Sequence, residues 1–486
     1  MSGKWKIAIL MLTVIALISG CFGEKPVLEE LGEDGKGKLK VLFHDENSFY
    51  REYGNYFNVK FPEIEFEVIS MNEIYANQEG PVDYKAEMKK YLDKHKPDVM
   101  FLDQEAYSEY AQEGKLYNLD AVIAQEKFDL EGYMPGLIDM IREKGNGSMY
   151  GLTPYFYTNV MYFNADLFKE HGIQEPSNKM TWQEVIDLSS RFANIGTGED
   201  QIYGMYEEYG QADQLLSKIA ATSSLQLFDA KGEKLLINSD GWKNAIKTTA
   251  DAIRSKAIYV NPPSNDENGP VYMRNDDNKF LAGKAAMILD GPWYMNQLKN
   301  RKMYNKNAKD FDWGIVTVPI DPASPDTSAT VYLNELYAIS ADSANKRAAW
   351  EFIKFVNGPE VAKAASRAMD GRIPTRNQFF KEVDGKSMEA FYMLKPKDSN
   401  TSWGNENVPM EFYQPFRKLE TEALQTVIDN KKTVDEAVAE LQQKGEAALI
   451  KAREEEKARK AAEQAKSGSS SDKASGEATE GESDTK

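Results

Sequence analysis

The feature that most constrains the fold is the alternation of strand-like and helix-like patterns along the chain, between about residues 39 and 453. Four short, mostly apolar runs have the length of buried strands: residues 40–43, 65–69, 98–102 and 285–289. A capping box, Thr-Trp-Gln-Glu at 181–184, opens one amphipathic helix, and an apolar stripe at 348–356 forms another that ends at Asn-Gly-Pro. Strands that alternate with helices predict an α/β architecture.

Length and charge narrow the classes of protein to which the chain can belong. Its 486 residues allow two to four domains. With 59 Lys and Arg against 77 Asp and Glu, the formal net charge is −18, which disfavours binding to nucleic acid and to anionic membrane surfaces. One cysteine and three histidines provide neither an internal disulfide nor a Cys/His zinc cluster.

The N-terminus has the pattern of a secretory signal, predicted to span residues 1–20. Lys4 and Lys6 precede the uncharged apolar residues 7–17, and small residues follow. The alternative, a membrane-spanning anchor, needs about 20 apolar residues, and charged residues follow too soon. The tetrad Ile-Ser-Gly-Cys at 18–21 resembles the lipobox of bacterial lipoproteins, in which the cysteine thiol receives a diacylglyceryl group and becomes the first residue. This resemblance implies lipidation of Cys21 and a location on the outer face of the cell membrane.

Both ends of the mature chain are polar. Residues 21–38 are rich in Gly, Glu and Lys and predict a flexible tether. Residues 454–486 predict a charged helix end followed by a tail, and residues 467–486 lack any large apolar side chain. Such a composition predicts disorder in that last stretch.

Three separated segments together resemble the extracellular solute-binding proteins of ABC importers, in the sugar-binding branch that includes maltose-binding protein. The first combines YGLTPY at 150–155 with YFNADLF at 162–168 and MTWQE at 180–184. The second combines FLAGKAAM at 280–287 with GPW at 291–293. The third combines AWEF at 349–352 with GRIPTR at 371–376. The chain departs from the family at Thr153, which interrupts a Leu-Pro pair, and at residues 331–337, where relatives carry a Gly-rich turn.

The resemblance implies a type II periplasmic-binding-protein fold, with two α/β lobes, a hinge of chain crossings and a ligand cleft between the lobes. Crossings are expected near residues 153–159, 330–337 and 399–403. Lobe one would comprise residues 39–155 and 335–398, and lobe two residues 156–330 and 400–453. The resemblance implies that lobe closure captures a carbohydrate of oligosaccharide size, which is then delivered to the subunits of an ABC permease in the membrane. It implies no cofactor and no bound metal, and the binding protein is expected to be a monomer.

The first candidate site residues follow from strand ends, because ligands of α/β sheets bind at the carboxyl ends of strands. His44, Asp45 and Asn47 follow the first predicted strand, and Asp103 and Gln104 follow the third. The alternative interpretation is that these are ordinary solvated loop residues.

The remaining candidates follow from the resemblance, since sugar sites combine aromatic faces with carboxylates and amides. Trp293 follows a Gly-Pro turn after a strand, and its alternative role is that of a core tryptophan, as we expect for Trp182 and Trp350. The other candidates lie at the expected crossings, in the second lobe or, for Arg372, in the Gly-Arg-Ile-Pro turn: Tyr155, Tyr157, Tyr206, Glu207, Asn334, Glu335, Arg372 and Trp403.

Enzymatic function has little support in the sequence. No nucleophile elbow, zinc-protease or dinucleotide-binding motif occurs in a fitting context. A surface glycosidase or esterase remains an alternative, because 77 acidic residues offer many carboxylate pairs. A surface adhesin without a small-molecule ligand is a further alternative. The acidic candidates favour a neutral, hydroxyl-rich or cationic solute over a phosphate.

Overall fold

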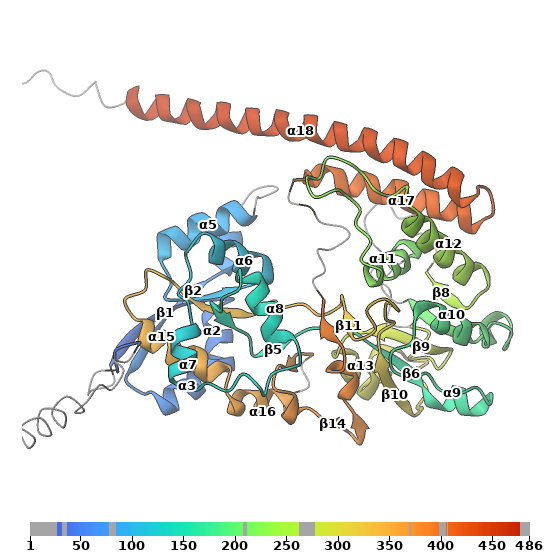
Figure 1. Ribbon diagram of the computed structural model, residues 1–486, viewed down its shortest axis with the longest axis horizontal. Coiled ribbons are helices and arrows are strands. Elements are labelled where there is room, and N and C mark those ends of the chain that lie inside the picture. Colours follow the sequence, from blue (N-terminus) through green and yellow to red (C-terminus); the bar gives the residue numbers. More distant parts are fainter. Residues whose placement is uncertain are drawn as a thin grey trace, which may run out of the picture. The chain divides into compact units, whose positions relative to one another are not determined.

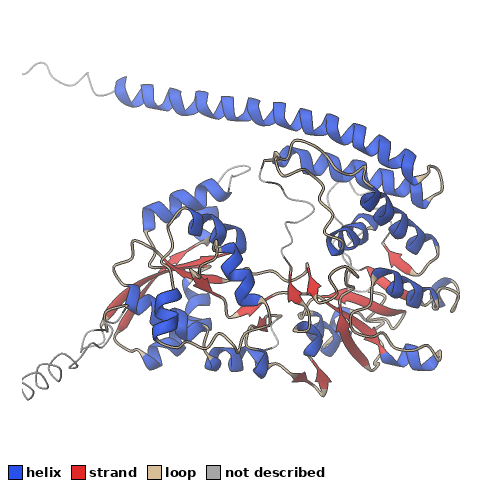
Figure 2. Cartoon of the chain, in the orientation of Figure 1, coloured by secondary structure: helices blue, strands red, loops and turns tan. Residues whose placement is uncertain are grey.

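A computed structural model describes residues 27–31, 36–76, 84–207, 211–261, 278–368, 371–397, 405 and 407–476 (Figure 1). The chain divides into two compact units. The first contains Met1–Phe156, Leu333–Arg367 and Pro374–Phe379, and the second contains Tyr157–Tyr332, Ala368–Ile373 and Phe380–Lys486. Each unit combines a mainly buried sheet with surrounding helices, so the α/β expectation is confirmed (Figure 2).

The first unit is built on a five-stranded sheet with the order β2-β1-β3-β12-β4. Its strands are β1 (Gly37–Phe43), β2 (Ile64–Ser70), β3 (Val99–Leu102), β4 (Gly151–Leu152) and β12 (Leu336–Ile339). β1 runs parallel to β2 and β3, and β12 runs antiparallel to β3 and β4. The three runs predicted as strands at 40–43, 65–69 and 98–102 lie in β1, β2 and β3, which confirms them.

Helices pack around this sheet. They are α2 (Glu46–Phe49), α3 (Asn55–Lys60), α4 (Asn72–Ala76), α5 (Tyr84–His95), α6 (Gln104–Gln112), α7 (Asp120–Gln125), α8 (Leu137–Lys144), α15 (Lys346–Val356) and α16 (Pro359–Ala368). A π-helical turn, η1 (Tyr50–Gly54), links α2 to α3. The rings of Phe49, Phe57, Phe66 and Phe352 meet mostly edge to face in the core, as buried aromatic rings prefer.

The second unit is built on a sheet with the order β10-β6-β9-β7-β8. Its strands are β6 (Val160–Asn164), β7 (Tyr203–Glu207), β8 (Ile258–Val260), β9 (Ala285–Asp290) and β10 (Trp313–Thr317). β7 runs parallel to β8 and β9, whereas β6 runs antiparallel to β9 and β10. The predicted strand at 285–289 is confirmed as β9.

The helices of the second unit include its C-terminal layer. They are α9 (Ala165–Glu170), α10 (Trp182–Ser190), α11 (Ala212–Thr222), α12 (Asp240–Arg254), α13 (Tyr294–Lys299), α14 (Arg301–Tyr304), α17 (Tyr413–Ile428) and α18 (Val434–Gly476). The shorter elements of the chain are β5 (Tyr155–Phe156), β11 (Thr327–Ser328), β13 (Ile373–Pro374), β14 (Glu382–Val383), β15 (Lys386–Ser387), β16 (Lys395–Pro396), η2 (Gly198–Asp200), η4 (Asn377–Phe379), η5 (Glu389–Phe391) and η6 (Met410–Phe412).

Local signals in the sequence account for several helix ends. The capping box forms at α10, where the Thr181 side chain accepts from the Glu184 N–H and the Glu184 side chain accepts from the Thr181 N–H. α15 ends at Asn357, as the Asn-Gly-Pro sequence predicts. Trp182 and Trp350 are buried, so their expected core role is confirmed.

The C-terminal part of the predicted lobe boundaries needs correction. The third crossing was expected near residues 399–403, with residues 335–398 in lobe one. The chain instead enters the second unit for Ala368–Ile373, returns to the first for Pro374–Phe379 and belongs to the second from Phe380 onward. Residues 380–397 belong to the second unit because β16 pairs with β11 and because Lys386 forms an ion pair with Asp312 at 2.6 Å.

The predicted disorder from residue 467 also needs correction, because α18 continues to Gly476 (the long red helix in Figure 1). The Ala-, Glu-, Lys- and Arg-rich residues before it are strong helix formers, and adding a turn to an existing helix is far easier than starting one. Residues 1–26, with the signal and Cys21, most of the tether and residues 477–486 lie outside the described residues. Among the helices that are described, none is long and apolar enough to cross a membrane.

Candidate functional site

Strand register gathers polar side chains at one edge of the first unit's sheet. β1 and β3 are parallel, so the residues that follow Phe43 and Leu102 reach the same edge. β12 is antiparallel to β3 and pairs Leu336 with Leu102, which brings the residues before Leu336 to that edge as well. His44, Asp103, Gln104, Asn334 and Glu335 therefore lie on neighbouring strand ends, and we call this set the polar edge.

His44, Asp45 and Asn47 differ in whether their side chains form hydrogen bonds with neighbouring residues or face solvent. The exposed His44 imidazole packs edge-on against Phe43 and Phe101, with ring centroids 5.4 and 4.8 Å apart. Asp45 caps α2 by accepting from the Ser48 N–H at 2.9 Å and from its hydroxyl at 2.7 Å, and these hydrogen bonds lower the pKa of the Asp45 carboxyl. Asn47 is exposed on α2. Asp45 thus has a structural role, while His44 and Asn47 present polar groups to solvent.

Asp103 and Gln104 lie at the start of α6. Asp103 is exposed and caps the helix, with its Oδ1 accepting from the Ala106 N–H at 2.8 Å. The backbone N–H of Gln104 donates to the Leu333 carbonyl at 3.1 Å, which fixes the β3 end against the chain that enters β12. The Gln104 Oε1 atom is buried and has no hydrogen-bond partner among the described residues, so it is an acceptor still to be satisfied.

A buried group of tyrosines lies behind the polar edge, around Glu335. Tyr53 on η1 and Tyr337 on β12 meet edge to face with centroids 5.8 Å apart. The pKa values of both phenols are raised well above the usual value, chiefly by burial and further by the nearby Glu335 and Tyr155. Glu335 precedes Tyr337 by two residues along the chain, and both Glu335 and Tyr155 are largely buried themselves. By contrast, Asn334 is exposed.

The second unit has an aromatic counterpart at its own strand ends. Trp293 is half-buried and follows β9, at the N-cap position of α13. Its indole folds back over Gly291, where an added Cβ would come within 2.2 Å of the ring atoms Cη2 and Cζ3. The Gly291 carbonyl accepts from the Tyr162 hydroxyl at 2.9 Å. Gly291 is needed for this close approach, because any side chain at this position would collide with the indole ring.

Tyr157 is paired with Tyr332, a residue that no sequence motif singles out. Tyr157 and Tyr332 exchange two backbone hydrogen bonds, of 3.1 and 3.0 Å. Their rings stack with centroids 5.3 Å apart and an interplanar angle of 16°. Tyr332 is 40% exposed, so the stacked pair is accessible to solvent. We call Tyr157, Tyr332 and Trp293 the aromatic edge, because the β6–β9 register brings the chain before Val160 to the end of β9 that precedes Trp293.

Tyr206 and Glu207 lie deeper than we expected from the sequence. Tyr206 is fully buried in β7, and its ring lies 6.0 Å from that of Tyr259. Glu207 is 2% exposed, and both carboxylate oxygens accept from Lys218 Nζ, at 2.7 and 2.6 Å. An internal ion pair therefore already occupies this carboxylate.

Of the two remaining candidates, Arg372 and Trp403, only Arg372 lies within the described residues. Arg372 is half-buried and follows Gly371, where an added Cβ would come within 3.1 Å of the Trp293 Cβ, so this turn lies beside the aromatic edge. The nearby Arg376 is structural: it is buried, and its Nη1 donates to Asp129 at 2.9 Å. Trp403 lies outside the described residues.

Each edge, taken by itself, has chemistry suited to one kind of contact with a ligand: the polar edge to hydroxyl groups and the aromatic edge to an apolar face. Carboxylate, amide and imidazole groups exchange hydrogen bonds with hydroxyls, and aromatic rings stack on apolar faces. Within the described ranges, His, Cys, Asp and Glu form no group that could hold a metal ion.

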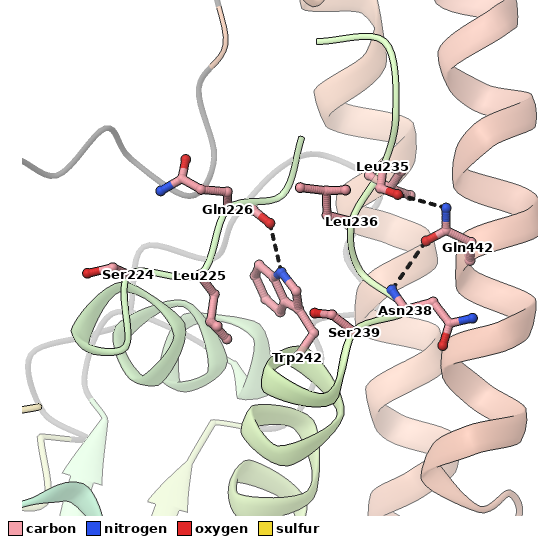
Figure 3. Close-up of a pocket in the computed structure, with 9 residues that line it drawn as sticks. All are labelled: Ser224, Leu225, Gln226, Leu235, Leu236, Asn238, Ser239, Trp242 and Gln442. Carbon is pink, nitrogen blue, oxygen red and sulfur yellow. Dashed lines mark hydrogen bonds between the residues drawn. The ribbon is translucent and has the colours of Figure 1, made fainter. Parts of the chain in front are cut away.

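A separate open pocket lies in the helical part of the second unit (Figure 3). It has a cavity volume of about 470 Å³ and is bounded by Trp242 at the start of α12 and Gln442 on α18. Trp242 Nε1 donates to the Gln226 carbonyl at 2.9 Å, and Gln442 Nε2 donates to the Leu235 carbonyl at 2.8 Å (Figure 3). None of the residues predicted to bind ligand lines this pocket.

Comparisons with known proteins agree with this architecture. Residues 46–363 match the model of the family described as bacterial extracellular solute-binding protein. An arabinooligosaccharide-binding protein of Bacillus subtilis is 23% identical over 291 residues, which cover 60% of this chain and 62% of the relative. A maltooligosaccharide ABC transporter solute-binding lipoprotein of Streptococcus pneumoniae is 21% identical over 307 residues, covering 60% and 65% respectively. The matched region thus spans less than two thirds of these relatives.

Solved structures show the same fold over more of the chain. The sugar-binding protein MalE of Xanthomonas citri has a TM-score of 0.60 at 20% identity, covering 86% of this chain and 98% of that one. A sugar transporter of Rhizobium etli in an open conformation has a TM-score of 0.60 at 21% identity, covering 85% and 100%. The expected type II periplasmic-binding-protein fold is confirmed. Because the family model matches more than half of its 486 residues, the chain belongs to the bacterial extracellular solute-binding proteins.

Proposed function

We propose that this chain binds a neutral carbohydrate of oligosaccharide size and delivers it, chemically unchanged, to an ABC permease in the membrane. The observation that carries the proposal is membership of the solute-binding family, together with the oligosaccharide named for both relatives above. The site chemistry supports it, since the polar edge offers hydrogen-bonding groups and the aromatic edge offers ring faces.

The choice of a neutral ligand follows from charge. The polar edge carries two acidic groups, Asp103 and Glu335, and the whole chain has a formal net charge of −18. A phosphorylated or carboxylated solute would be repelled by both, whereas sugar hydroxyls donate to carboxylates. We propose that the polar edge binds sugar hydroxyls through Glu335, Gln104, Asn334, Asp103 and His44. The aromatic edge would stack on sugar faces through Trp293, Tyr157 and Tyr332. Asn47 and Arg372 would provide additional polar contacts, Asn47 near the polar edge and Arg372 near the aromatic edge.

The proposal includes a lipid anchor on Cys21. A diacylglyceryl group on Cys21 would hold the protein at the outer face of the membrane, beside its permease. Cys21→Ala should release the protein into the medium or leave the precursor uncleaved. A variant that fractionates and migrates like the wild type would contradict the anchor.

A thermal-shift screen over neutral oligosaccharides, monosaccharides, polyols and sugar phosphates tests the ligand class. A ligand at 100 times its Kd should stabilise the protein by about 2.7 kcal/mol. We expect neutral oligosaccharides to give the largest shifts, and chromatography after incubation should recover the sugar intact. Conversion of the sugar would indicate a glycosidase instead, and a panel without any saturable shift would contradict carbohydrate binding.

A further inference from the structure

The C-terminal layer of the second unit encloses a carboxyl group that the proposed function does not use. Glu420 lies in the middle of α17, which packs with α11, α12 and α18 (Figure 1). The residue is only 1% exposed. Both of its carboxyl oxygens are buried and have no hydrogen-bond partner among the residues that the structure describes.

The surroundings of Glu420 are almost entirely apolar. The adjoining cavity is lined by Leu216 on α11, Ile246 on α12, Leu424 on α17 and Val438 and Leu441 on α18. This cavity is too narrow to hold a water molecule, so hydration cannot replace the missing partners. An ionised carboxylate in such a place would be strongly destabilising.

Two charged groups act on Glu420, and they belong to α11 and to α17 itself. Asp213, at the start of α11, is buried, and Arg417 Nε donates to its Oδ2 at 2.9 Å. Arg417 is therefore paired with Asp213 and does not form an ion pair with Glu420. The side chains that α12 and α18 present to the cavity are apolar, and the Lys243–Asp435 ion pair that joins those two helices lies outside its lining.

These surroundings favour the neutral acid. Burial raises the pKa of Glu420 well above its usual value, the negative charge of Asp213 raises it further, and Arg417 opposes the change. Glu351 in the first unit is also buried, but it accepts hydrogen bonds from both Arg347 and Lys354. Glu420 is therefore set apart by its lack of partners rather than by burial alone.

We propose that Glu420 is a proton-operated latch, which lets α17 pack among α11, α12 and α18 while it is protonated and loosens α17 when it loses its proton. The carboxylate formed at higher pH has to reach water, and with no space for water beside it, α17 has to move. This inference goes beyond carbohydrate binding and does not depend on it.

The direction of the pH dependence follows from linkage. A carboxyl whose pKa is higher in the folded than in the unfolded protein binds its proton more tightly when folded. The free energy of unfolding therefore falls as pH rises from the ordinary glutamate pKa, about 4.3, towards the raised folded value. Within that window the equilibrium constant for opening α17 should rise by up to tenfold per pH unit.

Glu420→Gln and Glu422→Gln form a matched pair for the test, because both remove one acid from α17 but Glu422 is exposed. Hydrogen exchange of the α17 amides, corrected for the intrinsic base-catalysed rate, and urea unfolding should be measured between pH 5 and 9. We expect wild type and Glu422→Gln to lose α17 protection with rising pH. Glu420→Gln should lack that component.

Glu420→Met provides a second variant, since an apolar side chain of similar size fits the cavity even if a buried amide does not. It too should remove the pH-dependent opening of α17. If either Glu420 variant folds and keeps the wild-type pH profile, the latch is excluded. It is equally excluded if wild-type α17 gains protection with rising pH, because that sign would indicate an ionised, paired carboxylate.

Discussion

The polar edge of the first unit and the aromatic edge of the second place different chemistry at the same topological position. Both lie at strand ends: after β1 and β3 and before β12 in one sheet, and after β9 and before β6 in the other. The first collects Asp103, Gln104 and Glu335, whereas the second collects Trp293 and the Tyr157–Tyr332 stack. Under the proposed function, this difference would amount to a division of labour, in which the polar edge recognises hydroxyls and the aromatic edge supplies apolar contact area.

The largest effect on affinity should come from the aromatic edge, with Trp293→Ala. Loss of ring stacking should weaken sugar binding by about 2–4 kcal/mol, as for aromatic hot spots. The unliganded protein should melt near the wild-type temperature, because the indole is half-buried and lies over Gly291 instead of filling the core. Isothermal titration calorimetry and melting curves measure the two quantities.

Trp182→Ala is the control for this prediction, as a tryptophan buried in the same unit that donates to Thr222 Oγ1 at 2.9 Å. It should cost about 3–5 kcal/mol of folding stability and leave the affinity of the folded fraction unchanged. If Trp293→Ala behaves like Trp182→Ala, Trp293 is a core residue and the aromatic edge loses its main member.

The next largest effect should come from the polar edge, with Glu335→Gln. Hydrogen bonds to a charged group contribute about 1.5–3 kcal/mol, so affinity should fall by roughly 10- to 100-fold. Glu131→Gln removes the same charge from an exposed position in the first unit and should have no measurable effect. Equal affinities for wild type and Glu335→Gln would mean that the carboxylate serves only the buried tyrosine cluster.

Much of this comparison could be predicted from sequence because it depends on local patterns. The apolar runs that became β1, β3 and β9 are short and continuous, and a polar residue that follows such a run necessarily lies at a strand end. The capping box at Thr181 is likewise a four-residue signal. Local patterns therefore predicted the strand-end positions of Asp103, Gln104 and Trp293, whereas Asn334 and Glu335 were selected through the family resemblance.

Pairings between distant residues could not be predicted in the same way. Tyr332 lies 175 positions after Tyr157, and only the bridge between their backbones stacks the rings. Lys218 satisfies Glu207 because α11 packs beside the end of β7, and nothing in the sequence around Glu207 indicates this. The third crossing was misplaced for the same reason, since the β11–β16 pairing that holds residues 380–397 is long-range.

A smaller effect should separate ring stacking from hydrogen bonding at Tyr332. Tyr332→Phe keeps the ring and should bind almost like the wild type, whereas Tyr332→Ala should lose about 0.5–1.5 kcal/mol of affinity. Calorimetric titrations of both variants with the same oligosaccharide provide the test. If Tyr332→Phe loses as much affinity as Tyr332→Ala, the ligand contacts the hydroxyl of Tyr332. That result would contradict the proposal that Tyr332 contributes its ring face.

The smallest effect on affinity is expected at Asp103, where helix capping and ligand binding make opposite predictions. The Asp103 carboxylate accepts from the Ala106 N–H at 2.8 Å, so Asp103→Ala should destabilise the fold by about 1 kcal/mol. Asparagine caps helices as well as aspartate does, so Asp103→Asn should restore stability. If capping is the main role of Asp103, Asp103→Asn should also bind sugar with less than a twofold change in Kd. A tenfold loss of affinity in Asp103→Asn at unchanged stability would instead make the charge itself part of the ligand contact, and the polar edge would then rely on two carboxylates where Glu335 alone is expected to dominate.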